Sequence, residues 1–261
     1  MSTPPARPEG TGQRFLIDGK LLEEAEALAL FRHGRIDAHL LDARQRTALE
    51  MLGRLIPQGA VLDVGCYAGT FTEMARRRSP RLRVMGCDAV DDHIRLAKLL
   101  YPDHAADYIR CSVYGLAFPD ASFDGVSFQA VIEHVDRPVD AVREIHRVLK
   151  PGGVVIVNTP NAASLAALAY GFLREVRGVG RRLRRRPSRM PHEIFFAESE
   201  WNRHIYAWTV PTLTTLFVVN GYEYVEHRLI GNDPVTRAIP GMGREILLAV
   251  RKSHPAPTGI V

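Results

Sequence analysis

The sequence predicts an α/β fold in which helices cover both faces of a mostly parallel sheet. Between residues 61 and 159, short apolar runs of strand character alternate with amphipathic helical segments. This alternation is typical of parallel sheets that are buried on both faces. The 261 residues are 46% hydrophobic and 24% charged. This is a globular composition, long enough for one sizeable core but hardly for a second full domain.

The start of the chain, MSTPPARPEGTGQRF, lacks the apolar core of a signal peptide. Residues 1–19 are therefore expected to be a disordered lead-in, and residues 20–261 to form one domain. No apolar run reaches the roughly 18 residues that cross a bilayer. Cys66, Cys87 and Cys111 are far apart in sequence and give neither a disulfide framework nor a metal-ligand spacing. A reducing cytoplasm is the expected location.

The order of elements follows from periodicity and from turn residues. Residues 20–56 have leucine and alanine at helical spacing and are expected to be helical. Asp91 or Asp92 can cap a later helix, and Asp136 can cap another. The predicted strands are 61–64, 82–88, 108–113, 123–128, 154–159, 222–230 and 244–251, and further helices are predicted at 70–78 and near 210–220.

A glycine motif follows the first predicted strand of the alternating region. Asp63, Gly65 and Gly69 form D-x-G-x-x-x-G. Gly65 permits a tight turn or a positive φ, and Gly69 lets backbone amides approach a ligand closely. Asp88 ends the next strand, where a carboxylate can accept hydrogen bonds from ribose hydroxyls. These features indicate a nucleoside-containing ligand at the carboxyl ends of the strands.

Three interpretations of the motif compete. A dinucleotide site needs G-x-G-x-x-G, but Tyr67 takes the place of the second glycine. S-adenosylmethionine has no phosphate, and needs room for an amino-acid moiety beside the first turn and an acid for the ribose. In the third interpretation the glycines only shape a turn.

Five segments together resemble the class I S-adenosylmethionine-dependent methyltransferases, in the small-molecule branch related to the ubiquinone-biosynthesis enzymes. They are VLDVGCYAGTFT (61–72), VMGCDAV (84–90), GLAFPDASFDGVSFQAVIEHVDRP (115–138), REIHRVLKPGGVVIVNTPN (143–161) and, more weakly, RHIYAWTVPTLTTLFVVNGYEYV (203–225). The resemblance implies a Rossmann-like, seven-stranded, mostly parallel sheet with one antiparallel strand near its C-terminal edge. It also implies that residues 160–208 are a helical or irregular insertion serving as a substrate lid.

The resemblance implies S-adenosylmethionine as the cofactor, with contacts at Asp63, Gly65, Cys66, Gly69, Asp88, Ala89, Ser112, Val113 and Gln129. The residues of the glycine motif would line its methionine part, and Asp88 would hold the ribose. Ala89 and Val113 would lie at the adenine, and Gln129 beside the sulfonium. Ser112 stands where many relatives carry an acid, although a serine could still hydrogen-bond the adenine amine. Cys66 is a variable position in the family, so no redox role follows from it.

The catalytic group is left open among three histidines. Methyl transfer is an in-line displacement, so the protein mainly aligns the reactants and excludes water. An oxygen acceptor usually needs a general base, and histidine suits this role at neutral pH. The candidates are His134, His192 and His204, with purely structural roles as the alternative. Some relatives bind a metal through Glu-x-x-Glu-His, but Ala130 replaces the first glutamate here, so no metal is expected.

The predicted insertion is first apolar, then basic, then aromatic. Its segment 174–189 holds eight arginines and one glutamate, whereas the whole chain has a net charge of only +5. The basic charge is therefore local. Arg181 to Arg186 could grip an acidic acceptor or an anionic membrane surface. They could also bind nucleic acid, which the slightly acidic remainder disfavours, or form a solvated surface helix.

Together these features predict a methyltransferase for a small or lipid-linked acceptor, with O-methylation favoured over N- or C-methylation. It is expected in the cytoplasm, with peripheral membrane contact as a variant. Two alternatives remain at this point. One is an RNA methyltransferase that uses the arginine-rich insertion, and the other is a non-catalytic docking module that keeps the cofactor pocket.

Overall fold

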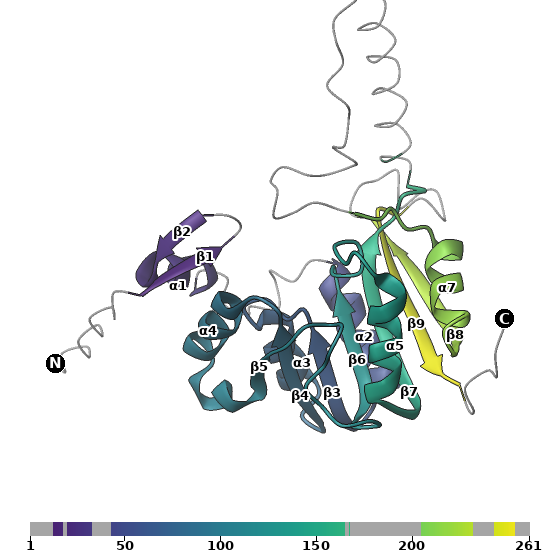
Figure 1. The fold of residues 1–261 in the computed structure, drawn as a ribbon, viewed down its shortest axis with the longest axis horizontal. Coiled ribbons are helices and arrows are strands. Elements are labelled where there is room, and N and C mark those ends of the chain that lie inside the picture. Colours follow the sequence, from purple (N-terminus) through teal and green to yellow (C-terminus); the bar gives the residue numbers. More distant parts are fainter. Residues whose placement is uncertain are drawn as a thin grey trace, which may run out of the picture.

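A computed structural model describes residues 13–17, 20–32, 43–164, 167, 205–231 and 243–253. Its centre is a seven-stranded sheet with the order β5-β4-β3-β6-β7-β9-β8 (Figure 1). Strand β9 runs antiparallel to both of its neighbours, whereas the pairs from β5 to β7 are parallel. The predicted fold class is confirmed, including one antiparallel strand near the C-terminal edge.

The strands of this sheet are short and mostly apolar. They are β3 (Gly59–Val64), β4 (Leu82–Asp88), β5 (Tyr108–Arg110), β6 (Phe123–Gln129), β7 (Leu149–Pro160), β8 (Tyr222–Ile230) and β9 (Glu245–Lys252). The last four residues of β3 are buried, as expected for a central strand between two helical layers. Strand β7 begins five residues earlier than predicted because Leu149 already pairs with Phe123 of β6.

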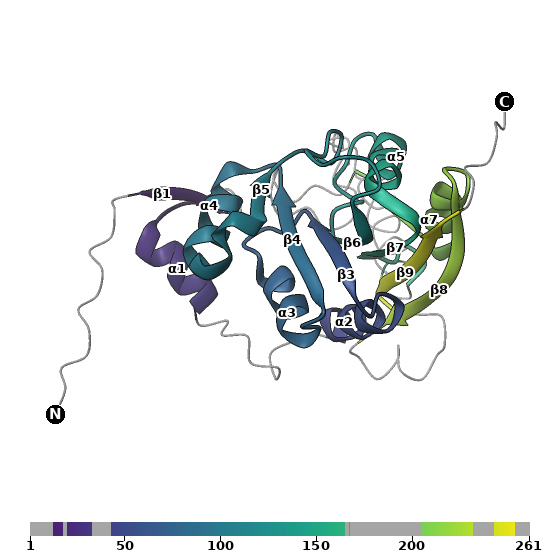
Figure 2. The ribbon, with the colours of Figure 1, turned by 90° about the horizontal axis from the view of Figure 1, so that it is seen from below.

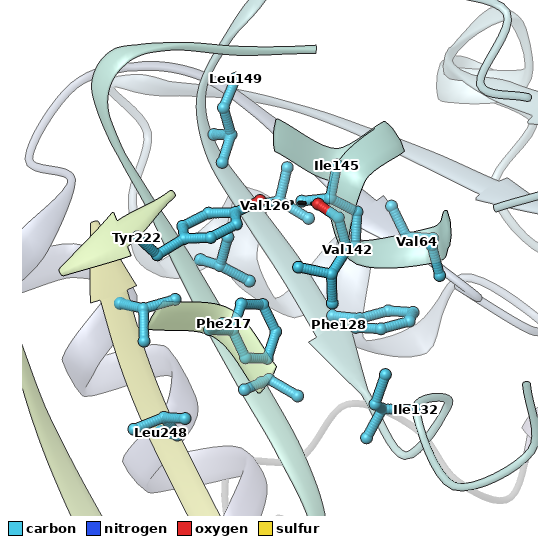
Figure 3. Close-up of a cluster of buried hydrophobic side chains, with 14 of the residues drawn as sticks. Val64, Val126, Phe128, Ile132, Val142, Ile145, Leu149, Phe217, Tyr222 and Leu248 are labelled. Carbon is cyan, nitrogen blue, oxygen red and sulfur yellow. Dashed lines mark hydrogen bonds between the residues drawn. The ribbon is translucent and has the colours of Figure 1, made fainter. Parts of the chain in front are cut away.

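Helices cover both faces of the sheet (Figure 2). Their bounds are α2 (Ala43–Leu55), α3 (Thr70–Arg78), α4 (Asp91–Leu100), α5 (Pro138–Val148) and α7 (Val210–Val218), and a 3-10 helix, η1 (Pro102–Asp107), precedes β5. Helices α2 and α3 pack on one face through apolar residues at helical spacing, and α5 and α7 pack on the other. The larger cluster lies on the second face (Figure 3), where Tyr222 Oη donates a 3.0 Å hydrogen bond to the carbonyl of Val142.

The N-terminal region differs from the prediction. Residues 14–17 were expected in a disordered lead-in, but they form β1 (Arg14–Ile17), which pairs with β2 (Lys20–Glu23) ahead of α1 (Glu24–Arg32). Phe15 and Ile17 are buried in a cluster with Leu96 of α4. The backbone N–H of Leu16 also donates a 2.8 Å hydrogen bond to Asp92 Oδ2. The expected helix over 20–56 is therefore wrong at 20–23, while residues 1–12, 18–19 and 33–42 lie outside the described part.

Asp136 does not cap α5, contrary to the prediction. Arg137 occupies the N-cap position and Pro138 begins the helix, as proline often does because its missing N–H needs no partner there. The carboxylate of Asp136 instead accepts a hydrogen bond from Tyr114 Oη. This contact ties the loop after β5 to the start of α5.

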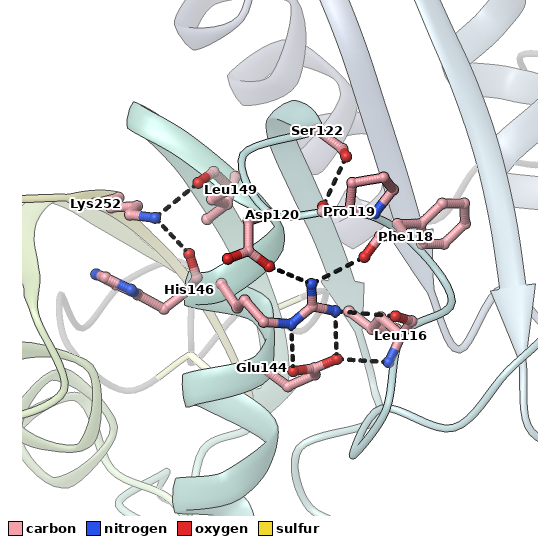
Figure 4. A network of polar contacts seen from close by, with 10 residues as sticks. Leu116, Phe118, Pro119, Asp120, Ser122, Glu144, His146, Leu149 and Lys252 are labelled. Carbon is pink, nitrogen blue, oxygen red and sulfur yellow. Dashed lines mark hydrogen bonds and ion pairs between the residues drawn. The ribbon is translucent and has the colours of Figure 1, made fainter.

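Arg147, near the other end of α5, holds the same loop. Figure 4 shows Leu116, Phe118, Asp120 and Glu144, which it contacts. Its guanidinium donates to the carbonyls of Leu116 and Phe118 at 3.0 and 2.9 Å. It also pairs with Asp120 and Glu144, both at 2.7 Å. Glu144 in turn accepts the backbone N–H of Leu116 at 2.7 Å. One planar guanidinium thus fixes the loop that carries residues 112 and 113.

The predicted lid insertion over 160–208 lies mostly outside the described residues. Strand β7 extends to Pro160, and Asn161 forms an isolated parallel bridge with Trp208. The basic run from Arg181 to Arg186 is not among the described residues. Within the part of the chain that the structure describes, no helix is long and apolar enough to span a membrane.

Candidate functional site

A pocket opens at the switch in strand order. Strand β3 lies between β4 and β6, so the chain passes outward through β4 and β5 and then returns to β6 on the opposite side. Ligands of open α/β sheets bind in the crevice beyond the carboxyl ends of such strands. A pocket of about 300 Å³ lies there, lined by Arg44, Gln45, Asp63, Gly65, Cys66, Tyr67, Thr70, Phe71, Gln129, Ala130 and Asn158. This volume is at the lower end of the range for small-molecule sites.

The loop between β3 and α3 adopts left-handed backbone at three positions. The φ angles are +74° at Gly65, +53° at Tyr67 and +78° at Gly69. The backbone N–H groups of Gly65 and Cys66 both donate to the carbonyl of Cys87, at 2.8 and 2.9 Å. The left-handed turns therefore fold the loop across the end of β4. Glycine adopts this backbone freely at positions 65 and 69, whereas Tyr67 holds it with a side chain present.

Asp63 is the buried carboxylate of the pocket. It is 2% exposed and accepts a 2.7 Å hydrogen bond from Thr72 Oγ1. Burial raises its pKa to about 7 against the opposing effect of the Thr72 hydrogen bond. Its charge therefore changes near neutral pH, and a cationic ligand group would favour the ionised form.

Asp88 is held in place at the end of β4. Its Oδ2 accepts the backbone N–H of Tyr67 at 3.0 Å, and its Oδ1 accepts that of Val90 at 2.9 Å. The Nδ1 atom of His93 lies 3.1 Å from the same Oδ1. Burial alone would raise the pKa of Asp88, but these hydrogen bonds, that of His93 foremost, keep it below its ordinary value. An ionised carboxylate with lone pairs to spare is what a ribose hydroxyl needs.

A second buried carboxylate, Glu133, follows β6. It is 2% exposed, accepts a 3.0 Å hydrogen bond from Thr159 Oγ1, and has its pKa raised to about 7 by burial. The neighbouring His134 is half-buried, with its backbone N–H bonded to the carbonyl of Val131 at 2.9 Å. His192 and His204 lie outside the described residues, so their roles stay predictions.

The structure brings together only part of the predicted set. Asp63, Gly65, Cys66 and Gln129 line the pocket. Gly69 is the N-cap of α3 and follows the pocket loop directly. The carboxylate of Asp88 accepts a hydrogen bond from the backbone N–H of Tyr67, which belongs to this loop.

Three predicted adenine contacts do not line this pocket. Ala89 and Ser112 are exposed and Val113 is half-buried, in the segments that follow β4 and β5. The N–H of Cys111 donates to the carbonyl of Asp88 at 3.0 Å, which keeps the two segments adjacent. Adenine contact at these three residues stays a prediction.

Sequence reasoning missed several lining residues. Arg44 and Gln45 lie in the first turn of α2, nineteen and eighteen positions before Asp63, and no local sequence pattern marks them as pocket residues. Asn158 did carry a signal, because a polar residue near the end of the apolar run VVIVNT is unusual in a buried strand. Among the described residues, no group of three or more histidines, cysteines or acids could hold a metal ion.

Comparison with known proteins identifies the central part of the chain. Residues 62–157 match the family model described as a methyltransferase domain. The chain is 32% identical over 109 residues to a ubiquinone/menaquinone biosynthesis C-methyltransferase of Desulfotalea psychrophila, covering 41% of this chain and 44% of that protein. It is 37% identical over 128 residues to a ubiquinone biosynthesis O-methyltransferase of Xanthomonas axonopodis, covering 46% and 53%. The chain thus spans about half the length of the curated relatives it matches.

Solved structures extend the likeness to most of the fold. A methyltransferase of Thermotoga maritima, titled a possible histamine N-methyltransferase, superposes with a TM-score of 0.59, at 18% identity over 88% of this chain and 96% of that one. A protein titled a [4+2]-cyclase superposes with a TM-score of 0.56, at 16% identity over 81% and 82%. The resemblance to class I S-adenosylmethionine-dependent methyltransferases is confirmed, and it implies S-adenosylmethionine as the cofactor.

The pocket residues suit that cofactor. S-adenosylmethionine carries a carboxylate and an ammonium on its amino-acid part, and the pocket offers the guanidinium of Arg44 and the carboxylate of Asp63. The left-handed turn at Gly65 brings bare backbone to the same place. Asp88 supplies a fixed carboxylate for the ribose at the neighbouring strand end.

Proposed function

Because residues 62–157 match the model of a methyltransferase domain, we propose that this protein transfers a methyl group from S-adenosylmethionine to a small or lipid-linked acceptor. The observation that carries the proposal is the pocket at the strand-order switch, where Arg44, Asp63 and Gly65 meet. Oxygen is the acceptor atom we favour. Relatives named as O-methyltransferases support this, although a C-methyltransferase is also among them.

The cofactor supplies an activated methyl on a sulfonium, so the protein has to bind, orient and exclude water. In our proposal Arg44 and Asp63 hold the charged ends of the amino-acid part, and Asp88 fixes the ribose. The rigid left-handed turn at Gly65 limits movement of the bound group. In this proposal, alignment of the acceptor atom with the methyl group accounts for most of the acceleration over the uncatalysed transfer.

An oxygen acceptor also needs a group that removes its proton. His134, His192 and His204 remain our candidates, and buried Glu133 is a further one because its pKa of about 7 suits proton transfer near neutral pH. Glu133 and His134 follow the pocket residues Gln129 and Ala130 by three to five positions in the sequence, although neither is among the residues that line the pocket. Substituting each residue separately and comparing pH–rate profiles would distinguish them.

Calorimetric titration with S-adenosylmethionine and with NAD tests the cofactor assignment. We expect micromolar binding of S-adenosylmethionine and no measurable binding of NAD. The opposite pattern would overturn the proposal. Transfer of a labelled methyl group to a panel of phenols, alcohols and amines would then identify the acceptor atom.

Binding without transfer to any acceptor would support the non-catalytic module instead. The cyclase structure that superposes on this chain illustrates that one fold can serve a chemistry other than methyl transfer. An RNA acceptor would show as steeply salt-dependent RNA binding. We also propose that the protein is cytoplasmic and that Arg181 to Arg186 contact an anionic membrane surface. Co-sedimentation with vesicles that contain or lack anionic lipid tests this contact.

A further inference from the structure

Cys87 and Cys111 lie next to each other, although they are far apart in sequence. Cys87 is the last but one residue of β4, and its register partner in β5 is Ile109. Cys111 follows Ile109 by two positions, so side-chain alternation places it on the same face of the sheet as Cys87. The N–H of Cys111 continues the strand pairing, because it donates to the carbonyl of Asp88 at 3.0 Å. The two thiols accordingly meet at one apolar cluster, in which Cys87 is buried and against which Cys111 packs.

The two thiols differ in how readily they ionise. A side-chain hydrogen bond from Cys87 stabilises the thiolate of Cys111 and lowers the pKa of Cys111. The same hydrogen bond, together with burial, raises the pKa of Cys87 well above its ordinary value. Cys111 is half-buried, whereas Cys87 is 1% exposed. Because the thiolate is the reactive form, Cys111 is the member of the pair that an oxidant attacks first.

Cys66, the third cysteine of the chain, does not belong to this pair. It lies in a separate buried cluster with Ile94, Ala97 and Tyr108. Its Sγ donates to the carbonyl of Tyr67 at 3.7 Å. Burial raises the pKa of the Cys66 thiol strongly, so this thiol stays protonated and unreactive. Cys66 therefore offers a matched comparison for the pair.

We propose that Cys111 is a site of reversible oxidation by hydrogen peroxide and that Cys87 is its resolving thiol. The Cys111 thiolate attacks one peroxide oxygen, so an S–O bond forms, the O–O bond breaks and hydroxide leaves. The Cys87 sulfur then attacks the sulfenic sulfur of Cys111. An S–S bond forms, and the sulfenic hydroxyl leaves as water with the proton of the Cys87 thiol. The two sulfurs together give up two electrons, and a small-molecule thiol restores both by exchange.

The disulfide would act on the backbone that shapes the cofactor pocket. The carbonyl of Cys87 accepts the N–H groups of Gly65 and Cys66, and Asp88 follows Cys87 directly. A disulfide holds its sulfurs about 2 Å apart, closer than two thiols in contact, so the end of β4 must shift toward Cys111. This consequence rests on the proposed function, in which Asp88 and the turn at Gly65 hold S-adenosylmethionine. Loss of one hydrogen bond there weakens binding about three- to tenfold.

Peptide mass spectrometry after treatment with hydrogen peroxide tests the oxidation site. We expect a reducible link between Cys87 and Cys111 in the wild type and in Cys66→Ser. In Cys87→Ser, Cys111 should stop at the sulfenic acid, which dimedone traps. In Cys111→Ser no link should form, and this variant carries the comparison alone if the buried Cys87→Ser does not fold. A link through Cys66, or no link in the wild type, overturns the inference.

Calorimetric titration with S-adenosylmethionine tests the effect on the pocket. We expect the linked wild type to bind about three- to tenfold more weakly than the reduced protein, with recovery after dithiothreitol. Peroxide treatment of Cys111→Ser should leave its affinity unchanged. Unchanged affinity in the linked wild type, or equal weakening in Cys111→Ser, overturns this effect. Failure of the reduced wild type to bind the cofactor would count against the proposed function, whereas the mass-spectrometric result judges the oxidation site independently.

Discussion

Gly65 and Val131 pack so closely that a Cβ atom on Gly65 would lie 2.3 Å from Cγ2 of Val131. Gly65 also has a φ of +74°, so a side chain would suffer backbone strain as well as a clash. The turn after β3 and the turn after β6 are thereby held against each other. The pocket lies between the same two strand ends.

Gly65→Ala is therefore expected to destabilise the fold by about 2–4 kcal/mol, combining strain at positive φ with overpacking. Urea unfolding followed by circular dichroism measures this. Gly115→Ala is the matched control, because no atom lies within 4 Å of its added Cβ and its φ is not in the left-handed range. Equal stability of the two variants would contradict the argument.

Asp88→Ala is expected to weaken S-adenosylmethionine binding by at least about tenfold. The substitution removes a hydrogen-bonded carboxylate and leaves the N–H groups of Tyr67 and Val90 without their partner. Isothermal titration measures the affinity. Asp91→Ala is the control, since Asp91 begins α4 nearby with a side chain that is 57% exposed. Unchanged affinity in Asp88→Ala would show that the ribose assignment is wrong.

Arg147→Leu is expected to cost about 2–4 kcal/mol of stability, because two carbonyls and two carboxylates lose a charged donor. Amide hydrogen exchange should also speed up in residues 112–120. Arg147→Lys keeps the charge but not the planar fork, and should recover only part of the loss. Full recovery with lysine would mean that charge alone holds the loop.

Asp63 should make stability fall as pH rises. Burial raises its pKa from 3.8 to about 7, so between these values the folded state holds a proton that the unfolded chain has lost. The free energy of unfolding then decreases with pH in this window, by at most about 1.4 kcal/mol per pH unit. Asp63→Asn should flatten that slope, as measured by urea unfolding at about pH 5 and pH 7.

Asp88→Asn is the control, because Asp88 should change the free energy of unfolding with pH in the opposite direction to Asp63. The pKa of Asp88 is lowered, so its stabilisation is present above the ordinary carboxyl pKa and is lost as pH falls below it. Glu133→Gln should act in the same direction as Asp63→Asn, because burial raises the pKa of Glu133 to about 7. A slope unaffected by Asp63→Asn would contradict the assigned burial effect.

The alternation of strands and helices could be predicted because the buried strands are mostly apolar and the helices that cover them carry apolar residues at helical spacing. Strand β1 could not be predicted, since its two buried residues, Phe15 and Ile17, pack with Leu96 and Ala68, which are far along the chain. The cap of α5 was misassigned for a similar reason. Asp136 bonds the hydroxyl of Tyr114, a partner that local pattern does not reveal.

In the site, Asp63 and Gly65 could be found because a carboxylate and a positive-φ glycine at a strand end leave a local signature. Arg44 could not, because an arginine on a surface helix looks like many others until the sheet brings α2 to the pocket. The role of Asn158 depends on Glu245 and Ile246, nearly ninety residues away. Glu245 and Ile246 come close to Asn158 only when β9 pairs with β7.

The position of β9 also bears on how the chain is made. Strand β8 leaves the ribosome before β9, yet β9 is the strand it pairs with in the sheet. Until β9 has emerged, the apolar edge of β7 stays open and β8 has no strand to join. Because unpaired strand edges are prone to aggregation, nascent chains stalled before residue 245 should bind chaperones, and release should follow once β9 inserts between its two neighbours.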